Sequence, residues 1–246
     1  MKTITKVLCL LLCLTMPVGM IASCDSGNAG NPNSSQDSQT EEISKPSEES
    51  KDPEPGPIPT EGLSYTLLDD DTYEASVGTA TEEEEIIIPA TYEGKAVTSI
   101  ARQAFLGCEN VTKISLPKSI TNIEPYAFSS CKKLSEILVA KENTEFQSID
   151  GNLYSKDGTC LIQYARGKSL TQFLVPDSVT TIGGYAFAPC NLSQLTITNS
   201  VTSIGEYAFG ACNQLTDIYF TGTEEEWNTI EKSSAKIPSS ATIHFN

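Results

Sequence analysis

The sequence predicts a solenoid of stacked α/β repeats, and two observations lead to this fold class. First, an Ala-Phe pair recurs with a cysteine three residues after Phe, and the four copies place Phe at positions 105, 128, 187 and 209. Second, each cysteine precedes apolar residues that alternate with other residues, as in Ile114-Ser115-Leu116, which is the period of a β-strand. A unit this short cannot bury its apolar face alone, so the copies must stack.

Each copy is expected to add one strand and one turn to the stack. Strands within residues 111–116, 134–139, 192–197 and 215–220 should lie side by side as a short parallel sheet on one face. The Ala-Phe-x-x-Cys stretch should form a short helical or 3₁₀ turn on the opposite wall. There Ala permits close approach of neighbouring copies, and Phe fills the interior.

The 59-residue interval between the second and third Phe indicates one ordinary period plus an inserted variant. Residues 146–164 are typical of a strand, a tight turn and a strand, because Asp150-Gly151 and Asp157-Gly158 supply the positive φ that hairpin turns require. Calcium loops are the alternative interpretation. They would need a ligand at the position of Tyr154, so hairpin turns are favoured.

Segments before and after the repeats are expected to cover the two open ends of the stack. Residues 63–67 and 72–77 predict an N-terminal β-hairpin cap. Residues 224–230 predict a short helix with acids at its favoured N-terminus, which would lay Trp227 over the last rung before a final strand at 242–245. Covered ends are what a monomeric stack demands.

Residues 1–23 have the pattern of a signal peptide. Lys2 and Lys6 supply a positively charged region before an apolar stretch at residues 7–18, which is too short to span a bilayer comfortably. The segment ends in Ile21-Ala22-Ser23-Cys24, which resembles the lipobox of bacterial lipoproteins. That resemblance implies cleavage before Cys24, lipidation of its thiol and anchoring in the bacterial cell envelope. An ordinary secretory signal with an unmodified cysteine is the alternative.

Residues 24–60 are expected to form a lipidated cysteine followed by a disordered tether. Residues 61–246 are expected to form the repeat domain with its caps. Residues 25–60 hold three non-proline apolar residues against seven Ser, six Pro and eight acidic residues, so no core can form there. The whole chain of 246 residues carries a formal charge of −16 and has a pI of about 4.4. Phosphate backbones would be repelled, which disfavours nucleic-acid binding.

The repeat is similar to a known family at several motifs that occur in order. It is clearest at Ile204-Gly205-Glu206-Tyr207-Ala208-Phe209-Gly210-Ala211-Cys212, and residues 92–100 and 149–154 also match segments typical of that family. The sequence thereby resembles the BspA-type leucine-rich repeats of bacterial surface proteins. This resemblance implies a right-handed leucine-rich-repeat solenoid displayed on the cell surface, and adhesion to host proteins or other cells as found for some relatives. Fold carries over more securely than function.

Cysteine and histidine give little indication of chemistry. Cys108, Cys131, Cys190 and Cys212 recur at one position of the repeat, where small interior residues are expected; disulfides and metal binding are the alternatives. No C-x-x-C occurs, and the only histidine, His244, lies near the end of the sequence. The acidic runs at 82–85 and 224–226 suit solvated faces or a helix N-terminus, with weak cation binding as the alternative. We therefore predict no catalytic residue, metal or cofactor.

The outward strand positions are the most informative surface. If the strands share one register, two exposed rows form a candidate partner-binding strip: Lys113, Glu136, Gln172, Gln194 and Asp217 in one row, and Ser115, Leu138, Leu174, Thr196 and Tyr219 in the other. Leu138, Leu174 and Tyr219 could share one stripe, and Tyr is enriched at interfaces. Scattered exposed apolar residues, normal on any protein, are the alternative.

These observations predict a non-catalytic, surface-exposed and lipid-anchored protein whose solenoid binds an extracellular protein or glycan. Two alternatives remain from other classes. The domain could be a structural or spacer component of an envelope assembly. It could also process glycans, because acids on neighbouring strands can lie close enough to act as a pair, although the sequence singles out no such pair.

Overall fold

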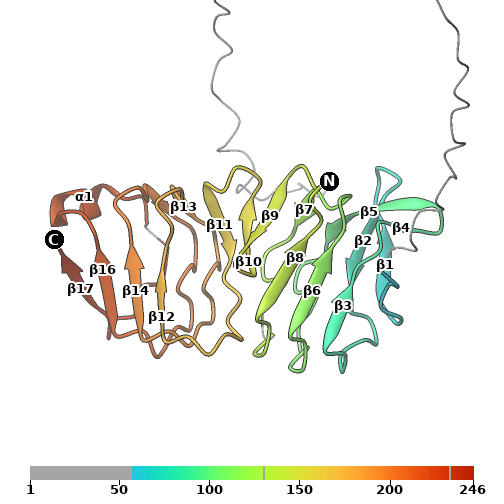
Figure 1. Ribbon diagram of the computed structural model, residues 1–246, viewed down its shortest axis with the longest axis horizontal. Helices are drawn as coiled ribbons and strands as arrows, with labels where there is room; N and C mark the ends of the chain where they lie inside the picture. The colour runs from blue at the N-terminus through green and yellow to red at the C-terminus, as the bar shows by residue number, and fades with distance from the viewer. Residues whose placement is uncertain (1–56, 130, 233) are drawn as a thin grey trace, which may run out of the picture. The chain divides into compact units, whose positions relative to one another are not determined.

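The computed structural model describes residues 57–129, 131–232 and 234–246, so the predicted signal peptide, Cys24 and most of the tether lie outside the described residues. The described residues form a β-solenoid of 17 short strands and one helix. Successive strands follow one another along its length, as the change of colour from blue to red shows (Figure 1).

One face of the solenoid is parallel, as the repeats predict, but it consists of two sheets. The first contains β3 (Glu85–Ile87), β6 (Lys113–Leu116) and β8 (Glu136–Val139). The second contains β12 (Gln172–Leu174), β14 (Gln194–Ile197), β16 (Asp217–Phe220) and β17 (Thr242–Phe245). In β6 and β14, alternate residues are buried, which is the expected consequence of the strand period.

A second set of parallel pairs lines another face, which the repeat pattern does not predict. It contains β2 (Tyr73–Ser76), β5 (Lys95–Ile100) and β7 (Asn122–Ile123), and farther along β11 (Cys160–Gln163), β13 (Thr181–Ile182) and β15 (Ser203–Ile204). Two antiparallel strands extend the first of these groups: β1 (Ser64–Leu67) pairs with β2, and β4 (Thr91–Tyr92) pairs with β5.

The Ala-Phe-x-x-Cys stretches form turns that are closed by hydrogen bonds over three residues, such as that from the N–H of Cys108 to the Phe105 carbonyl at 3.2 Å, and their described residues do not continue into a helix. The reason is that part of the backbone bonds to the next rung. The N–H of Phe105 donates to the Ala127 carbonyl at 2.9 Å, and the N–H of Phe209 donates to the Ala235 carbonyl at 3.0 Å. These N–H groups are therefore not available for the hydrogen bonds within a helix. The fold is therefore a β-solenoid rather than an α/β repeat.

The insert forms a three-stranded antiparallel unit of β9 (Phe146–Ile149), β10 (Asn152–Ser155) and β11. Both Asp-Gly pairs lie in its turns, as predicted, with φ of 49° at Asp150 and 71° at Gly151. The Asp157 carboxylate accepts hydrogen bonds from the Ser155 hydroxyl and from the Thr159 N–H and hydroxyl. These bonds lower the pKa of Asp157 and fix the second turn.

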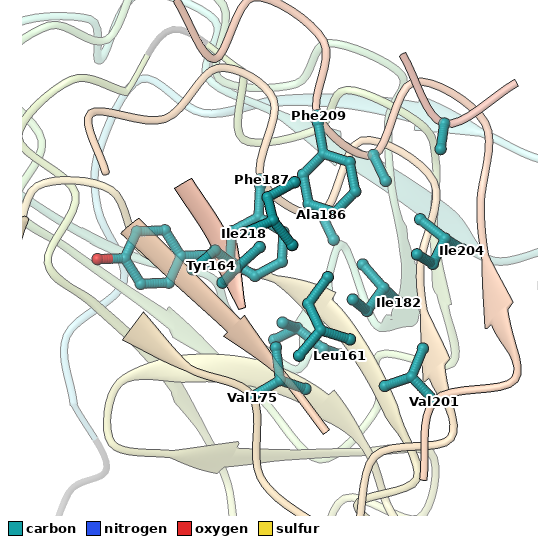
Figure 2. Close-up of a cluster of buried hydrophobic side chains, with 14 of the residues drawn as sticks. Leu161, Tyr164, Val175, Ile182, Ala186, Phe187, Val201, Ile204, Phe209 and Ile218 are labelled. Carbon is teal, nitrogen blue, oxygen red and sulfur yellow. The ribbon is translucent and has the colours of Figure 1, made fainter. Parts of the chain in front are cut away.

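Phenylalanines from successive rungs stack in the interior. Phe105 and Phe128 have centroids 5.7 Å apart, and Phe187 and Phe209 have centroids 5.6 Å apart. In the rung of the insert Tyr164 takes the place of Phe, 5.4 Å from Phe187, and its hydroxyl points away from the packed aliphatic side chains (Figure 2).

The described residues contain a single helix, α1 (Glu224–Thr229). Its N-cap residue is Thr223, which forms a capping box with Glu226. In this part of the chain, no helix has the length and apolar character needed to cross a membrane.

Candidate functional site

The outward face of the sheet β12–β14–β16–β17 carries two rows of side chains. Register places Gln172, Gln194, Asp217 and Thr242 side by side in the first row, and Leu174, Thr196, Tyr219 and His244 in the second. The residues between the rows, such as Leu195 and Ile218, are buried. Six of the ten residues of the predicted strip therefore lie together on this face.

The other four predicted residues lie on the separate sheet β3–β6–β8. Lys113 is beside Glu136, and Ser115 is beside Leu138. The insert separates the two sheets, because the N–H of Ile137 in β8 donates to the Gly151 carbonyl at 2.9 Å. The Asp-Gly turn thus occupies the edge of β8 where the next repeat strand was expected. Leu138 consequently does not join the row of Leu174 and Tyr219.

The second row on β12–β17 exposes apolar and aromatic surface. Leu174 is 59% exposed and Tyr219 is 39% exposed. The Tyr219 ring stacks on the His244 imidazole with centroids 4.6 Å apart and an angle of 15° between the planes. Both rings stand on paired strands, and Thr196 lies between this stacked pair and Leu174 in the row.

The two rows are joined by a hydrogen bond between side chains. His244 Nε2 lies 2.7 Å from Asp217 Oδ1, and the Thr216 hydroxyl donates to Asp217 Oδ2 at 2.8 Å. The hydrogen bond from His244, followed by that from Thr216, lowers the pKa of Asp217. Sequence reasoning left His244 out of the strip, although aligning residues 242–245 with 217–220 would have placed it beside Tyr219.

Both acidic runs contain a residue with a structural partner. Glu82 accepts a hydrogen bond from Asn110 Nδ2 at 3.1 Å. Glu226 accepts from the N–H of Thr223 at 2.8 Å and so completes the cap of α1. Within residues 57–246, leaving out 130 and 233, no group of three or more His, Cys, Asp and Glu residues is arranged to hold a metal ion.

The column of cysteines lies in the interior, as predicted from the repeat. Cys108, Cys131, Cys190 and Cys212 are buried and are free thiols. The Cys131 thiol donates to the Phe105 carbonyl at 3.4 Å, and the Cys212 thiol donates to the Phe187 carbonyl at 3.3 Å. These two thiols tie their rungs to the preceding ones, while Cys160 is buried in β11 of the insert.

Comparison with solved structures gives bacterial leucine-rich repeat proteins. The pneumococcal vaccine antigen PcpA is 25% identical with a TM-score of 0.43, over 55% of this chain and 41% of that chain. A leucine-rich repeat protein of T. pallidum is 20% identical with a TM-score of 0.37, over 77% of this chain and 64% of that chain. The chain therefore spans less than two thirds of the length of either protein.

A leucine-rich cell surface protein of Faecalibacterium prausnitzii is 17% identical with a TM-score of 0.35, over 72% of this chain and 98% of that chain. A search of curated proteins gives no match. The family model described as the BspA type leucine-rich repeat region matches residues 81–158 and 163–245, with six copies. These segments make up well over half of the sequence and contain both parallel sheets of the first face, so the chain belongs to the BspA-type leucine-rich repeat family.

Proposed function

We propose that the solenoid is a non-catalytic binding module that recognises an extracellular protein or glycan through the outward face of β12–β17. The observation that carries this function is the row of Leu174, Thr196, Tyr219 and His244. It combines an exposed aliphatic side chain with a stacked pair of rings on a rigid sheet. Aromatic anchors of this kind dominate the energetics of protein interfaces.

The adjoining row supplies polar groups that can fix the orientation of a ligand. Gln172, Gln194 and Asp217 each lie two residues before a member of the apolar row on the same strand. Asp217 is also bonded to His244. An apolar centre bordered by hydrogen-bonding groups is the usual anatomy of a recognition surface. The Asp217 carboxylate is held by His244 and Thr216, so it is preorganised for such a role.

A binding comparison on arrays tests this function. The full chain, applied to arrays of purified extracellular matrix proteins and of glycans, should give a signal that is abolished in a variant carrying Leu174→Asp and Tyr219→Asp. Leu67→Asp is the matched control, because Leu67 is 52% exposed on β1, outside this face. Equal binding by the double variant and the control would show that the face of β12–β17 is not the binding surface.

We also propose that Cys24 is lipidated and displays the domain on the bacterial cell surface. The lipobox-like sequence before Cys24 and the membership of the repeat family support this localisation. Metabolic labelling with an acyl chain should mark the wild-type protein and leave Cys24→Ala unlabelled. Digestion of the domain by protease added to intact cells should then distinguish surface display from an inward-facing anchor.

We further infer that β1–β2 and α1–β17 act as end caps that keep the domain monomeric. β2 pairs with β5, so the hairpin extends the second face. Trp227 of α1 is 4% exposed and packs edge-on against Phe220 with centroids 5.3 Å apart. Sedimentation of the full chain at increasing concentration tests the monomeric state, and a concentration-dependent rise in mass would contradict it.

A further inference from the structure

Three tyrosines form a ladder on the turn wall, away from the face of β12–β17. Tyr126, Tyr185 and Tyr207 each stand two residues before the interior Phe of their rung. Tyr126 and Tyr185 have ring centroids 3.7 Å apart, and Tyr185 and Tyr207 have centroids 5.5 Å apart with an angle of 9° between the planes. We call these three residues the tyrosine ladder. It brings together residues that the insert separates by 59 positions in the sequence.

Each tyrosine of the ladder has a positive φ, with values of 62°, 61° and 52° in chain order. A bulky L-residue adopts this conformation only where the surroundings impose it. Here, the N–H of Tyr185 donates to the Glu206 carbonyl and that of Tyr207 to the Ser234 carbonyl, at 3.0 and 2.7 Å. The backbone of the rungs thus holds the rings in place, and the ladder is preorganised.

The ladder lines a groove of about 300 Å³. The rest of the lining consists of Ser129, Ala188, Pro189, Gly210 and Ala211. These residues are small, and among them only Ser129 carries a side-chain hydrogen-bonding group. The groove is therefore apolar apart from Ser129 and the tyrosine hydroxyls.

A cation lies at each end of the ladder. The Arg102 guanidinium lies 5.1 Å from the centroid of Tyr126, and Lys236 Nζ lies 5.3 Å from that of Tyr207. Within the described part of the chain, neither forms a salt bridge, so both charges are available to a ligand. In a chain with a net charge of −16, two unpaired cations around one apolar groove select for a ligand with negative charge at both ends.

Between the two cations the ladder offers tyrosine hydroxyls rather than positive charge. Burial and the hydrogen bond with Tyr126 raise the pKa of Tyr185, so this hydroxyl is already engaged within the ladder. The hydroxyls of Tyr126 and Tyr207 can donate to carbonyl oxygens of a ligand. Polyproline II offers such acceptors, because proline has no N–H and the carbonyls of this helix are free to accept hydrogen bonds.

We propose that the groove along the tyrosine ladder binds an extended, proline-rich peptide segment of a partner protein, with an acidic residue at each end of the bound stretch. Aromatic-lined grooves are a recurring way to bind such segments. The spacings along the ladder place Arg102 and Lys236 at most about 20 Å apart, which about six residues of polyproline II would span at about 3.1 Å per residue.

The test uses the full chain and a fluorescent probe of sequence Glu-Pro-Pro-Leu-Pro-Pro-Glu. Fluorescence anisotropy should show saturable binding. The affinity should fall at least tenfold for a probe with Lys in place of both Glu, and for a probe with Ala in place of the four Pro. Absence of binding by the acidic probe, or equal binding of the three probes, would overturn the proposal.

Two variants locate the binding site. Arg102→Glu combined with Lys236→Glu should weaken binding of the acidic probe at least tenfold and favour the Lys probe. Ser129→Trp should weaken both by filling the groove, and circular dichroism checks that the variants are folded. The control is Leu67→Asp, an exposed position on β1 outside the groove, which should bind the probe as the wild type does. Unchanged binding by the charge-reversed variant, or loss of binding in the control, would place the site elsewhere.

Discussion

His244 Nε2 lies 2.7 Å from Asp217 Oδ1, across the parallel strands β16 and β17 and 27 residues apart in the sequence. Register pairs Asp217 with Thr242 and Tyr219 with His244. The imidazole therefore reaches diagonally to the acid while its ring stacks on the tyrosine beside it. One histidine thus links the polar and the apolar rows of the candidate binding face.

Replacing His244 by Ala should raise the pKa of Asp217 toward the ordinary value of about 3.9, because the hydrogen bond from His244 is the largest cause of the lowered pKa. A carboxyl whose pKa is lower in the folded than in the unfolded state stabilises the fold above its unfolded pKa. That contribution is lost as the pH falls through the folded pKa. The His244→Ala variant should therefore lose this part of the pH dependence of its folding stability.

An NMR titration of the carboxyl carbons measures the change directly. Asp70 is the internal control, because hydrogen bonds from Thr72 lower its pKa and the substitution leaves them intact. An Asp217 pKa that stays the same in His244→Ala would contradict the role given to the hydrogen bond from His244.

Cys108 and Cys131 should resist alkylation in the folded protein. Burial raises the pKa of the Cys131 thiol to about 12 and that of Cys108 to about 11. The thiolate is the reactive form, so it is scarce at a pH of about 8. Treatment with iodoacetamide followed by mass spectrometry should find both thiols unmodified, and the same treatment in concentrated urea should modify both. Rapid modification without urea would mean that these rungs open readily.

Phe187→Ala should destabilise the domain by about 3–5 kcal/mol, the usual cost of deleting a buried aromatic ring. Phe187 is 1% exposed and packs against both Phe209 and Tyr164. Urea unfolding followed by circular dichroism measures the loss. Leu170→Ala is the control, because Leu170 is 48% exposed and should change stability by less than about 0.5 kcal/mol. Similar losses in the two variants would argue against a shared interior ladder.

The repeat and the interior ladder can be predicted from the sequence because each rung meets the same environment. Phe and Cys recur at fixed spacing, and the structure buries all four copies of both. The second face cannot be predicted in this way. Its strands are as short as Thr181–Ile182, and two residues are too few to show a strand period.

The candidate sites are harder to predict from the sequence because backbone contacts determine where their residues lie. The break between the two sheets depends on the Gly151 carbonyl, which accepts from the N–H of Ile137 and leaves no side-chain pattern. The tyrosine ladder depends on positive φ at Tyr126, Tyr185 and Tyr207, a conformation that tyrosine seldom adopts. In both cases the neighbouring rung, rather than the local sequence, determines the geometry.

Asn143 is a further residue whose importance appears only in the structure. It is 1% exposed, its Nδ2 donates to the carbonyls of Pro117 and Ile120, and its Oδ1 accepts from the N–H groups of Glu145 and Phe146. Asn143→Ala should cost about 2–3 kcal/mol, because it leaves buried backbone groups unpaired. Asn110→Ala, at a more accessible polar position, should cost much less in the same urea unfolding experiment. Equal costs would mean that water replaces the lost bonds.

Trp227→Ala should loosen the C-terminal rungs before the rest of the domain. The indole packs against Phe220 and is 4% exposed, so its removal uncovers the interior at that end of the stack. In a solenoid each rung contacts mainly its neighbours, so the loss should remain local. Amide hydrogen exchange should therefore accelerate in β16 and β17 and stay unchanged in β6. Trp227→Phe keeps an aromatic ring against Phe220 and should retain most of the protection. Equal acceleration in β6 would instead show that the whole solenoid unfolds as one unit, and α1 would then stabilise the domain globally rather than cap its last rung.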